Sequence, residues 1–434
     1  MAAYERRGPG RHRHHCRFRG SRVRARRRGA VTSFRRRENE LGVRVLSPLL
    51  VDGRNSSFAE RLTAIGAAGA VVTSQVNVRW LTGFTGSAGT VVVSTEEGVP
   101  MTLVTDGRYA EQATRQVADA RANVRVVECR TQIDLRAAVA SAVAAVVGSS
   151  GSVGLETSDI SLADYEALRS ACNDAGSNLA RDHVLDASPL LADLRRSKST
   201  AEIERITRAA AIADAALADI GAVIGAGSTE VEIRDGLETA MRRHGADDVS
   251  FATIVATGEN AALPHHRPST RRLQPGEAVV IDFGALVDGY HSDMTRTFVV
   301  DGPGAAEMID RHAVVRSACE AGVATVAPGV VAHEVDAACR RVLAAAGLEN
   351  ELTHGVGHGV GLLIHEAPWV NARSRDVLRP GDVVTVEPGA YRVGFGGARV
   401  EELLLVTDSG HLVLSNSPKE AKCPPSPRTI SRTE

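Results

Sequence analysis

The sequence predicts two folded domains, an α/β domain followed by an α+β domain that is assembled from two similar halves. A chain of 434 residues is too long for one small domain. From about residue 55 to residue 185, short β-branched runs alternate with helical stretches, which is typical of a three-layer α/β domain. Beyond residue 200, a helix pair followed by a Gly-rich, His-bearing segment occurs twice, which indicates an internal repeat.

The first domain is expected to begin with a helix over residues 58–69 and to contain a second helix over residues 109–117. Short runs rich in Val and Thr predict its strands. These runs cover residues 70–73, 90–94, 101–104 and 124–127. Residues 186–200 have the character of a connector. We therefore place this domain at residues 55–190.

Two capping boxes open the first helix pair of the second domain. Ser199 and Thr229 are each followed three residues later by a Glu, and the helices are expected to end at about residue 224 and at residue 243. The same order returns about one hundred residues later, in residues 314–326 and 333–346. The domain is placed at residues 200–419, and a site at the seam of its halves would draw side chains from both.

The charge of the chain is unevenly distributed. The net charge is −1, but the first 40 residues hold fourteen Arg and three Glu, so that 37 basic and 49 acidic residues remain elsewhere. An acidic body argues against nucleic-acid binding. The Arg-rich head, residues 1–54, is interpreted as a solvated tail or as the product of a start codon placed too far upstream. A nucleic-acid-binding or targeting arm is the alternative, and residues 420–434 are interpreted as a flexible tail.

The six cysteines are scattered, without a Cys-x-x-Cys pair, which indicates a reducing compartment. No run of 18 apolar residues exists, and the first forty residues lack the apolar stretch of a signal peptide. We therefore expect a cytoplasmic protein without a membrane segment.

Acidic residues stand in or beside Val-rich runs on both sides of His358, which itself lies in a Gly-rich segment. Four carboxylates and one imidazole that converge on a point would need cations between them, and these ligand types suit manganese, cobalt or zinc. Two such ions about 3.5–4 Å apart are a common hydrolytic arrangement. The sequence therefore predicts a metallohydrolase. The carboxylates are Asp282, Asp293, Glu387 and Glu401.

Two local patterns support this convergence. An Asp-Gly pair at residues 288–289 is typical of a hairpin turn, so Asp282 and Asp293 are expected on adjacent strands. Arg399 and Glu401 are two residues apart and are expected on one face of a single strand. Each Asp alone could equally be a buried, hydrogen-bonded turn residue.

Further histidines have catalytic potential. His265 and His365 fall one in each half of the repeat, within seventeen residues of a proposed ligand. Imidazoles beside a metal centre can stabilise a tetrahedral intermediate or hold the substrate. His354 could support the ligands from behind, whereas His266 is expected to be an outward-facing polar residue.

Several strings of the second domain resemble the pita-bread metallopeptidases, and most closely the Xaa-Pro peptidases, aminopeptidase P and prolidase. Residues 77–87 and 105–109 resemble the creatinase-type domain that precedes the catalytic domain in these enzymes. The resemblance covers roughly residues 55–419. The strings of the second domain are residues 263–265, 281–284, 290–297, 354–358, 385–389 and 397–401.

The resemblance implies a dinuclear metal site. Asp282 would chelate one ion, and Asp293 and Glu401 would bridge both. His358 and Glu387 would complete the second ion. The implied ions are Mn²⁺, with Co²⁺ or Zn²⁺ as alternatives.

The resemblance also implies a reaction. A hydroxide between the ions would attack the carbonyl that precedes proline, and Glu387 would shuttle the proton. His265 and His365 would stabilise the gem-diolate, with Arg399 as a charge partner. The implied substrate is a peptide with proline at the second position, and the implied assembly is a homodimer.

Three alternatives stay open. A creatinase-like hydrolase would act on a small guanidino compound without metal, and a catalytically silent member would bind peptide or histone. Both are expected to lack ligands that are present here. A methionine aminopeptidase would share the ligands but not the additional N-terminal domain. The choice between aminopeptidase and dipeptidase is also open.

Overall fold

The computed structural model describes residues 45–148, 151–177 and 179–422. The Arg-rich residues 1–44 and the tail residues 423–434 lie outside this part, so the interpretations of the head and of the tail stay predictions. Within the described part, no helix combines the length and the apolar character that a bilayer crossing requires.

The first domain is built on a six-stranded mixed sheet covered by helices. Its strands are β1 (Ala67–Val72), β2 (Thr90–Ser94), β3 (Met101–Asp106), β4 (Val124–Cys129), β5 (Ser152–Leu155) and β6 (Val184–Asp186). Its helices are α1 (Arg54–Ala64), α2 (Gln75–Thr82), α3 (Ala110–Asp119), α4 (Gln132–Val147) and α5 (Leu162–Asp174). The strand order is β4-β3-β2-β1-β5-β6, in which β2 runs antiparallel to both neighbours. The predicted α/β fold class is confirmed.

One expected helix in this region has other bounds, and the expected connector contains a helix. The helix expected over residues 58–69 begins earlier and ends at Ala64, because Gly66 takes a left-handed φ of +82° and such a residue ends a helix. The expected connector, residues 186–200, contains the helix α6 (Ser188–Arg196), which has a proline in its first turn, where proline is well tolerated.

The second domain carries two helix pairs. They are α7 (Thr200–Asp219) with α8 (Glu230–Arg243), and α9 (Ala305–Thr325) with α10 (Ala332–Ala345). Both predicted capping boxes are present; at Ser199, the backbone N–H donates to Glu202 Oε2 at 2.7 Å. Helix α7 ends at Asp219, five residues before the predicted end.

The main strands of the second domain repeat one order. The first half contains β8 (Ile254–Thr257), β9 (Ala278–Phe283) and β12 (Met294–Val299). The second half contains β13 (Gly357–Gly359), β14 (Glu366–Val370), β15 (Val383–Val386), β18 (Glu402–Thr407) and β19 (Gly410–Val413). The sheet orders β12-β9-β8 and β14-β13-β15-β18-β19 show that β8-β9-β12 recurs as β13-β15-β18. The predicted internal repeat is confirmed.

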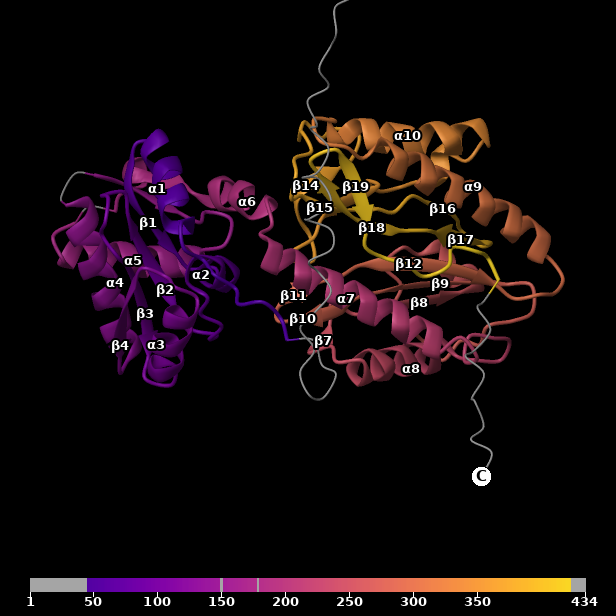
Figure 1. The fold of residues 1–434 in the computed structure, drawn as a ribbon, viewed down its shortest axis with the longest axis horizontal. Coiled ribbons are helices and arrows are strands. Elements are labelled where there is room, and N and C mark those ends of the chain that lie inside the picture. Colours follow the sequence, from indigo (N-terminus) through magenta and orange to yellow (C-terminus); the bar gives the residue numbers. More distant parts are fainter. Residues whose placement is uncertain (1–44, 149–150, 178, 423–434) are drawn as a thin grey trace, which may run out of the picture. The chain divides into compact units, whose positions relative to one another are not determined.

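Each half has a hydrophobic core of its own. Ile212, Leu237 and Phe283 belong to the core under α7 and α8, whereas Leu343 and Val384 belong to the core under α9 and α10. Burial of these side chains stabilises each helix pair against its own sheet. The strands of both halves lie between the two helix pairs (Figure 1).

Shorter strands complete the domain: β7 (Asp248–Val249), β10 (Ala285–Val287), β11 (Tyr290–His291), β16 (Gly389–Arg392) and β17 (Gly396–Arg399). The predicted hairpin turn joins β10 to β11, with Val287 opposite Tyr290 and positive φ at Asp288 and Gly289, as a two-residue turn requires. Where the chain leaves β9, a Cβ on Gly284 would lie 1.9 Å from the Ser292 carbonyl oxygen. Only glycine fits there.

Candidate metal centre

The first half of the repeat places two carboxylates side by side. Asp282 lies in β9, and Asp293 directly precedes β12. The two strands pair antiparallel, with Asp282 opposite Thr295. The predicted pairing of the two segments is confirmed, with Asp293 one residue before its strand.

The second half supplies the equivalent pair. Glu387 directly follows β15, and Glu401 directly precedes β18. The expectation that Arg399 and Glu401 share one strand is wrong. Arg399 ends β17, which pairs with β16 in a separate sheet, and the chain passes to β18 after Glu401. Both side chains are nevertheless buried.

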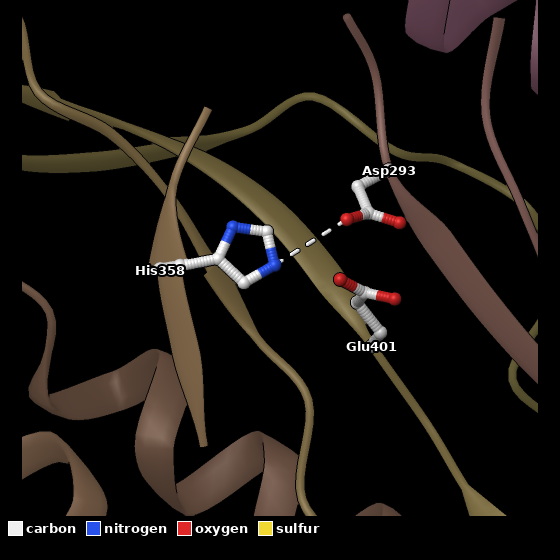
Figure 2. Close-up of side chains that lie close together, drawn as sticks. All are labelled: Asp293, His358 and Glu401. Atoms are coloured by element: carbon white, nitrogen blue, oxygen red, sulfur yellow. Dashed lines mark ion pairs between the residues drawn. The ribbon is translucent and has the colours of Figure 1, made fainter. Parts of the chain in front are cut away.

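Three of the candidate ligands converge on one point. Single ligand atoms of Asp293, His358 and Glu401 all lie within 4.8 Å of one another, and Figure 2 shows the three side chains pointing toward each other from separate segments. His358 Nε2 lies 3.5 Å from Asp293 Oδ2 and 3.5 Å from Glu387 Oε1. All three residues of the cluster are buried.

The orientation of His358 suits a metal ligand. Its Nδ1 lies 3.1 Å from the Gly359 carbonyl oxygen, which places the proton on Nδ1 and leaves the lone pair of Nε2 facing the carboxylates. Its backbone N–H donates to Thr385 Oγ1 at 3.0 Å. Burial lowers the pKa of His358 to about 4, so the imidazole is neutral near pH 7.

The carboxylates have the unpaired oxygens that cations would need. Among the described residues, Asp282 Oδ1, Asp293 Oδ1 and Glu401 Oε1 are buried without a hydrogen-bond partner. Such atoms are rare and carry a desolvation cost of about 1–3 kcal/mol each. Buried carboxylate oxygens beside a neutral imidazole are a donor set that fits divalent ions.

The pKa values of the candidate carboxyl ligands are raised because these groups are buried close together. Burial, and then the neighbouring carboxylates, raise the pKa of Asp293 and of Glu401 above the ordinary range. Burial raises the pKa of Glu387 to about 8. Without cations, these groups therefore hold protons that a bound ion would displace.

A network around Arg399 ties both halves together. Arg399 Nη2 lies 2.6 Å from Asp282 Oδ2, and its Nε donates to Thr295 Oγ1 at 3.0 Å. The Thr295 hydroxyl in turn donates to Glu401 Oε2 at 2.8 Å. Arg399 Nη1 donates to the Tyr391 hydroxyl at 2.9 Å, which also lies 2.9 Å from His354 Nε2.

Tyr391 and Thr295 were not predicted as site residues. Both are buried, and burial raises the pKa of Tyr391 to about 12. The only sequence signal for Tyr391 is an aromatic residue in an otherwise Gly-rich stretch four residues after Glu387.

The other histidines border the cluster. The ring of His365 lies edge-to-face with that of His358, with centroids 4.4 Å apart. Burial, with smaller contributions from nearby Arg399 and His265, lowers the pKa of His354 to about 4. His265 and His365 are both exposed, so they face the solvent side of a buried centre.

The expectation for His266 is wrong. Its Nε2 lies 2.8 Å from Glu230 Oε2, and its side chain is only 13% exposed. The ring turns inward because it adds a hydrogen bond to a buried carboxylate, and such bonds offset the cost of burying the charge.

A cavity of about 440 Å³ lies elsewhere, in the first domain, and Thr73, Arg136 and Asp164 are among its lining residues. None of the candidate ligands lines it. This cavity is therefore separate from the candidate metal centre.

Two similar α+β halves around a buried carboxylate–imidazole cluster define a metallopeptidase of the pita-bread fold. Known families match the chain in the same order: the Creatinase/Prolidase N-terminal domain over residues 54–197 and metallopeptidase family M24 over residues 204–408. The uncharacterized peptidase YqhT of Bacillus subtilis (strain 168) is 36% identical over 358 residues, which are 82% of this chain and 96% of that protein. The chain belongs to metallopeptidase family M24.

Solved structures share both domains. The Xaa-Pro dipeptidase from Bacillus anthracis superposes with a TM-score of 0.78 at 34% identity, covering 85% of this chain and 98% of that one. The X-Pro aminopeptidase from Thermotoga maritima MSB8 has a TM-score of 0.73 at 29% identity, covering 85% and 99%. The two-domain fold is thus found in enzymes named for both activities.

Proposed function

We propose that the protein is a metal-dependent exopeptidase that hydrolyses the bond between an N-terminal residue and a following proline. The observation that carries this proposal is the buried cluster of Asp293, His358 and Glu401. Its imidazole is neutral, and each of its two carboxylates has one buried oxygen without a hydrogen-bond partner among the described residues. The names of the Bacillus anthracis and Thermotoga maritima structures support the substrate class.

Five side chains would hold two divalent ions, Mn²⁺ first and Co²⁺ or Zn²⁺ as alternatives. Asp293 and Glu401, whose ligand atoms lie with that of His358 within 4.8 Å of one another, would be central to this ligand set. When bound, such ions supply a water of lowered pKa and polarise the scissile carbonyl. The five residues are Asp282, Asp293, His358, Glu387 and Glu401.

Glu387 is proposed as the group that moves the proton. Its Oε1 lies 3.5 Å from His358 Nε2, so this carboxylate stands beside the candidate ligands. A carboxylate placed there can take up a proton and release it again during the reaction. It would pass the proton to the proline nitrogen, which has no N–H in the peptide and must gain a hydrogen to leave as an amine.

His265 and His365 are proposed to stabilise the developing oxyanion and to hold the substrate. Both are exposed beside the buried ligands, where an imidazole N–H can donate to a bound carbonyl oxygen. Arg399 would act behind them, because its guanidinium fixes Asp282 and the Tyr391 hydroxyl. His354, through the same Tyr391 hydroxyl, would support this arrangement.

Apolar side chains accompany both histidines. Leu263 and Leu363 are 49% and 39% exposed, and each precedes its histidine, His265 or His365, by two residues. Exposed apolar groups at the border of a site suit an apolar ligand group. A proline ring is such a group.

The deciding experiment compares the hydrolysis of Ala-Pro, Ala-Pro-Ala and Met-Ala-Ser by the Mn²⁺-loaded protein. Cleavage of Ala-Pro alone defines a dipeptidase, and cleavage of Ala-Pro-Ala with release of Ala defines an aminopeptidase. Cleavage of Met-Ala-Ser alone would replace the proposal with a methionine aminopeptidase. Binding without cleavage of any of the three would favour a silent peptide-binding protein, and hydrolysis of creatine would favour the creatinase-like alternative.

We also propose a cytoplasmic homodimer. Cytoplasmic residence is supported by the four described cysteines, which are all free and buried: Cys129, Cys172, Cys319 and Cys339. The homodimer rests on the family resemblance, and light scattering of the purified protein measures its mass directly.

A further inference from the structure

A second buried carboxylate lies in the first half of the catalytic domain, outside the metal cluster. Glu230 is the first residue of α8 and is 0% exposed. An ionised carboxylate in such a place is costly unless it is fully hydrogen-bonded.

Glu230 is bonded through both oxygens. Oε1 accepts hydrogen bonds from the Thr257 N–H at 2.8 Å, the Thr257 hydroxyl at 3.0 Å and Asn260 Nδ2 at 3.0 Å. Oε2 accepts from the Ser269 N–H at 2.8 Å and the Ser269 hydroxyl at 2.6 Å, and lies 2.8 Å from His266 Nε2. Burial opposes ionisation, but these hydrogen bonds lower the pKa of Glu230 to about 2.

All of these partners belong to one segment, residues 257–269, which begins at the end of β8 and carries His265. Thr257 and Asn260 hold the segment before His265, and His266 and Ser269 hold it afterwards. Helix α8 binds the same segment through its backbone, because the Val231 N–H donates to the Ser269 carbonyl oxygen at 3.1 Å.

The same segment also contacts a residue of the candidate metal centre. The carbonyl oxygen of Pro264 lies 3.5 Å from Arg399 Nη1, and Arg399 also binds Asp282. His265 itself is exposed and directly precedes the anchored His266. The placement of the His265 ring therefore depends on the segment rather than on packing around the ring.

The carboxylate of Glu230 does not cap its own helix. The capping box of α8 is formed by Thr229 and Glu232, whose Oε2 accepts from the Thr229 N–H at 2.8 Å. The same helical turn thus contains one Glu that serves the helix and one that serves the segment of His265. This provides a matched pair for an experiment.

We propose that Glu230 is a positioning residue that keeps His265 in its catalytic position through its hydrogen bonds to residues 257–269. The inference rests on the proposed role of His265 and assigns no contact between Glu230 and the substrate. Replacing the carboxylate with a neutral amide would leave several donors of the segment without an acceptor, so that the segment and His265 would shift.

The test is a double-mutant cycle of Glu230→Gln and His265→Ala, with Glu232→Gln as the control. Kinetics on an Xaa-Pro substrate, manganese content and the melting temperature are measured for each protein. We expect Glu230→Gln to lower kcat about 10- to 100-fold, as a displaced group does, with unchanged manganese content. In the His265→Ala background, the same substitution should cost less than twofold. Glu232→Gln should leave kcat unchanged in both backgrounds.

The outcomes separate this inference from the proposed function. If His265→Ala alone does not slow the enzyme, the proposed role of His265 is wrong. Suppose that His265→Ala slows the enzyme and that Glu230→Gln lowers kcat by the same factor in the His265→Ala background as in the wild type. Glu230 then does not act through His265. Should Glu230→Gln fail to fold, Ser269→Ala and Asn260→Ala remove single donors. These two substitutions should lower kcat by smaller factors, and in the His265→Ala background they should have no effect. Losses of kcat that add to that of His265→Ala would overturn the inference.

Discussion

Arg399 and Asp282 form an ion pair in which Nη2 of the arginine lies 2.6 Å from Oδ2 of the aspartate, and their side chains are 3% and 14% exposed. The second oxygen of Asp282, Oδ1, is buried and has no hydrogen-bond partner in the described part of the chain. The guanidinium therefore fixes one oxygen of the carboxylate and leaves the other available to a cation.

Arg399→Lys should weaken metal binding and activity about 10- to 100-fold, as loss of groups that orient ligands commonly does. An ammonium group cannot hold Asp282, Thr295 and Tyr391 at once, because it lacks the planar fork of a guanidinium. Metal titration and kcat/KM measure the effect. The control is Arg242→Lys, since Arg242 pairs with Asp248 at the surface, both more than half exposed. Wild-type metal affinity in Arg399→Lys would show that the ion pair does not orient Asp282.

Asp293→Asn should abolish most of the peptidase activity and lower the metal content of the purified protein. The amide is neutral and offers one oxygen in place of two, in a cluster where single ligand atoms lie within 4.8 Å of one another. Metal analysis and hydrolysis of an Xaa-Pro peptide check this. Asp408→Asn, at an exposed turn, should match the wild type. Full activity of Asp293→Asn would remove Asp293 from the ligand set.

The metal-free protein should become less stable as the pH rises from about 6.5 to about 8. Burial raises the pKa of Glu387 to about 8, so in this window the folded protein binds more protons than the unfolded chain, and its free energy of unfolding falls with pH. At lower pH, His354 and His358 act in the opposite direction, because their pKa values are lowered to about 4. Melting temperatures in the presence of a chelator measure the slope.

Two further measurements test this origin of the pH dependence. Glu387→Gln should reduce the slope, since the amide does not titrate, and the remaining slope would come from Asp293 and Glu401, whose pKa values are also raised. Saturating Mn²⁺ should also flatten it, because a cation favours the ionised carboxylate. A metal-free melting temperature that rises over the same window would contradict the raised pKa of Glu387.

Gly357→Ala should destabilise the protein and reduce metal binding. A Cβ on Gly357 would lie 2.1 Å from the Thr385 carbonyl oxygen, so β13 and β15 would separate next to His358. The matched control is Gly236→Ala in α8, where the nearest atom is 3.7 Å away and alanine should stabilise by about 0.5–1 kcal/mol. Chemical denaturation measures both, and similar effects of the two substitutions would contradict the close approach.

The features that the sequence predicted correctly are local. The capping boxes at Ser199 and Thr229 and the Asp288-Gly289 turn depend on residues within three or four positions of each other. That turn was enough to predict the adjacency of Asp282 and Asp293. The internal repeat extended the same reasoning to the second half.

The features that escaped prediction depend on partners distant in sequence. In the sequence, Glu230 looks like an ordinary acidic residue in the first turn of a helix. Its proposed role depends on partners such as Ser269, which is 39 positions away and donates a hydrogen bond to it. His266 turns inward for the same reason. Arg399 and Glu401 were assigned to one strand because side-chain alternation cannot reveal that the chain changes sheets between them.

The recurring order of β8-β9-β12 and β13-β15-β18 has a consequence for how the catalytic domain could be divided. Residues 301–304, which join the halves, are exposed, and each half carries two of the four carboxylates that are candidate ligands. Fragments separated at this connection would each lack a complete ligand set. Uptake of a divalent ion would then report complementation, since it requires that the two fragments find each other and re-form the seam.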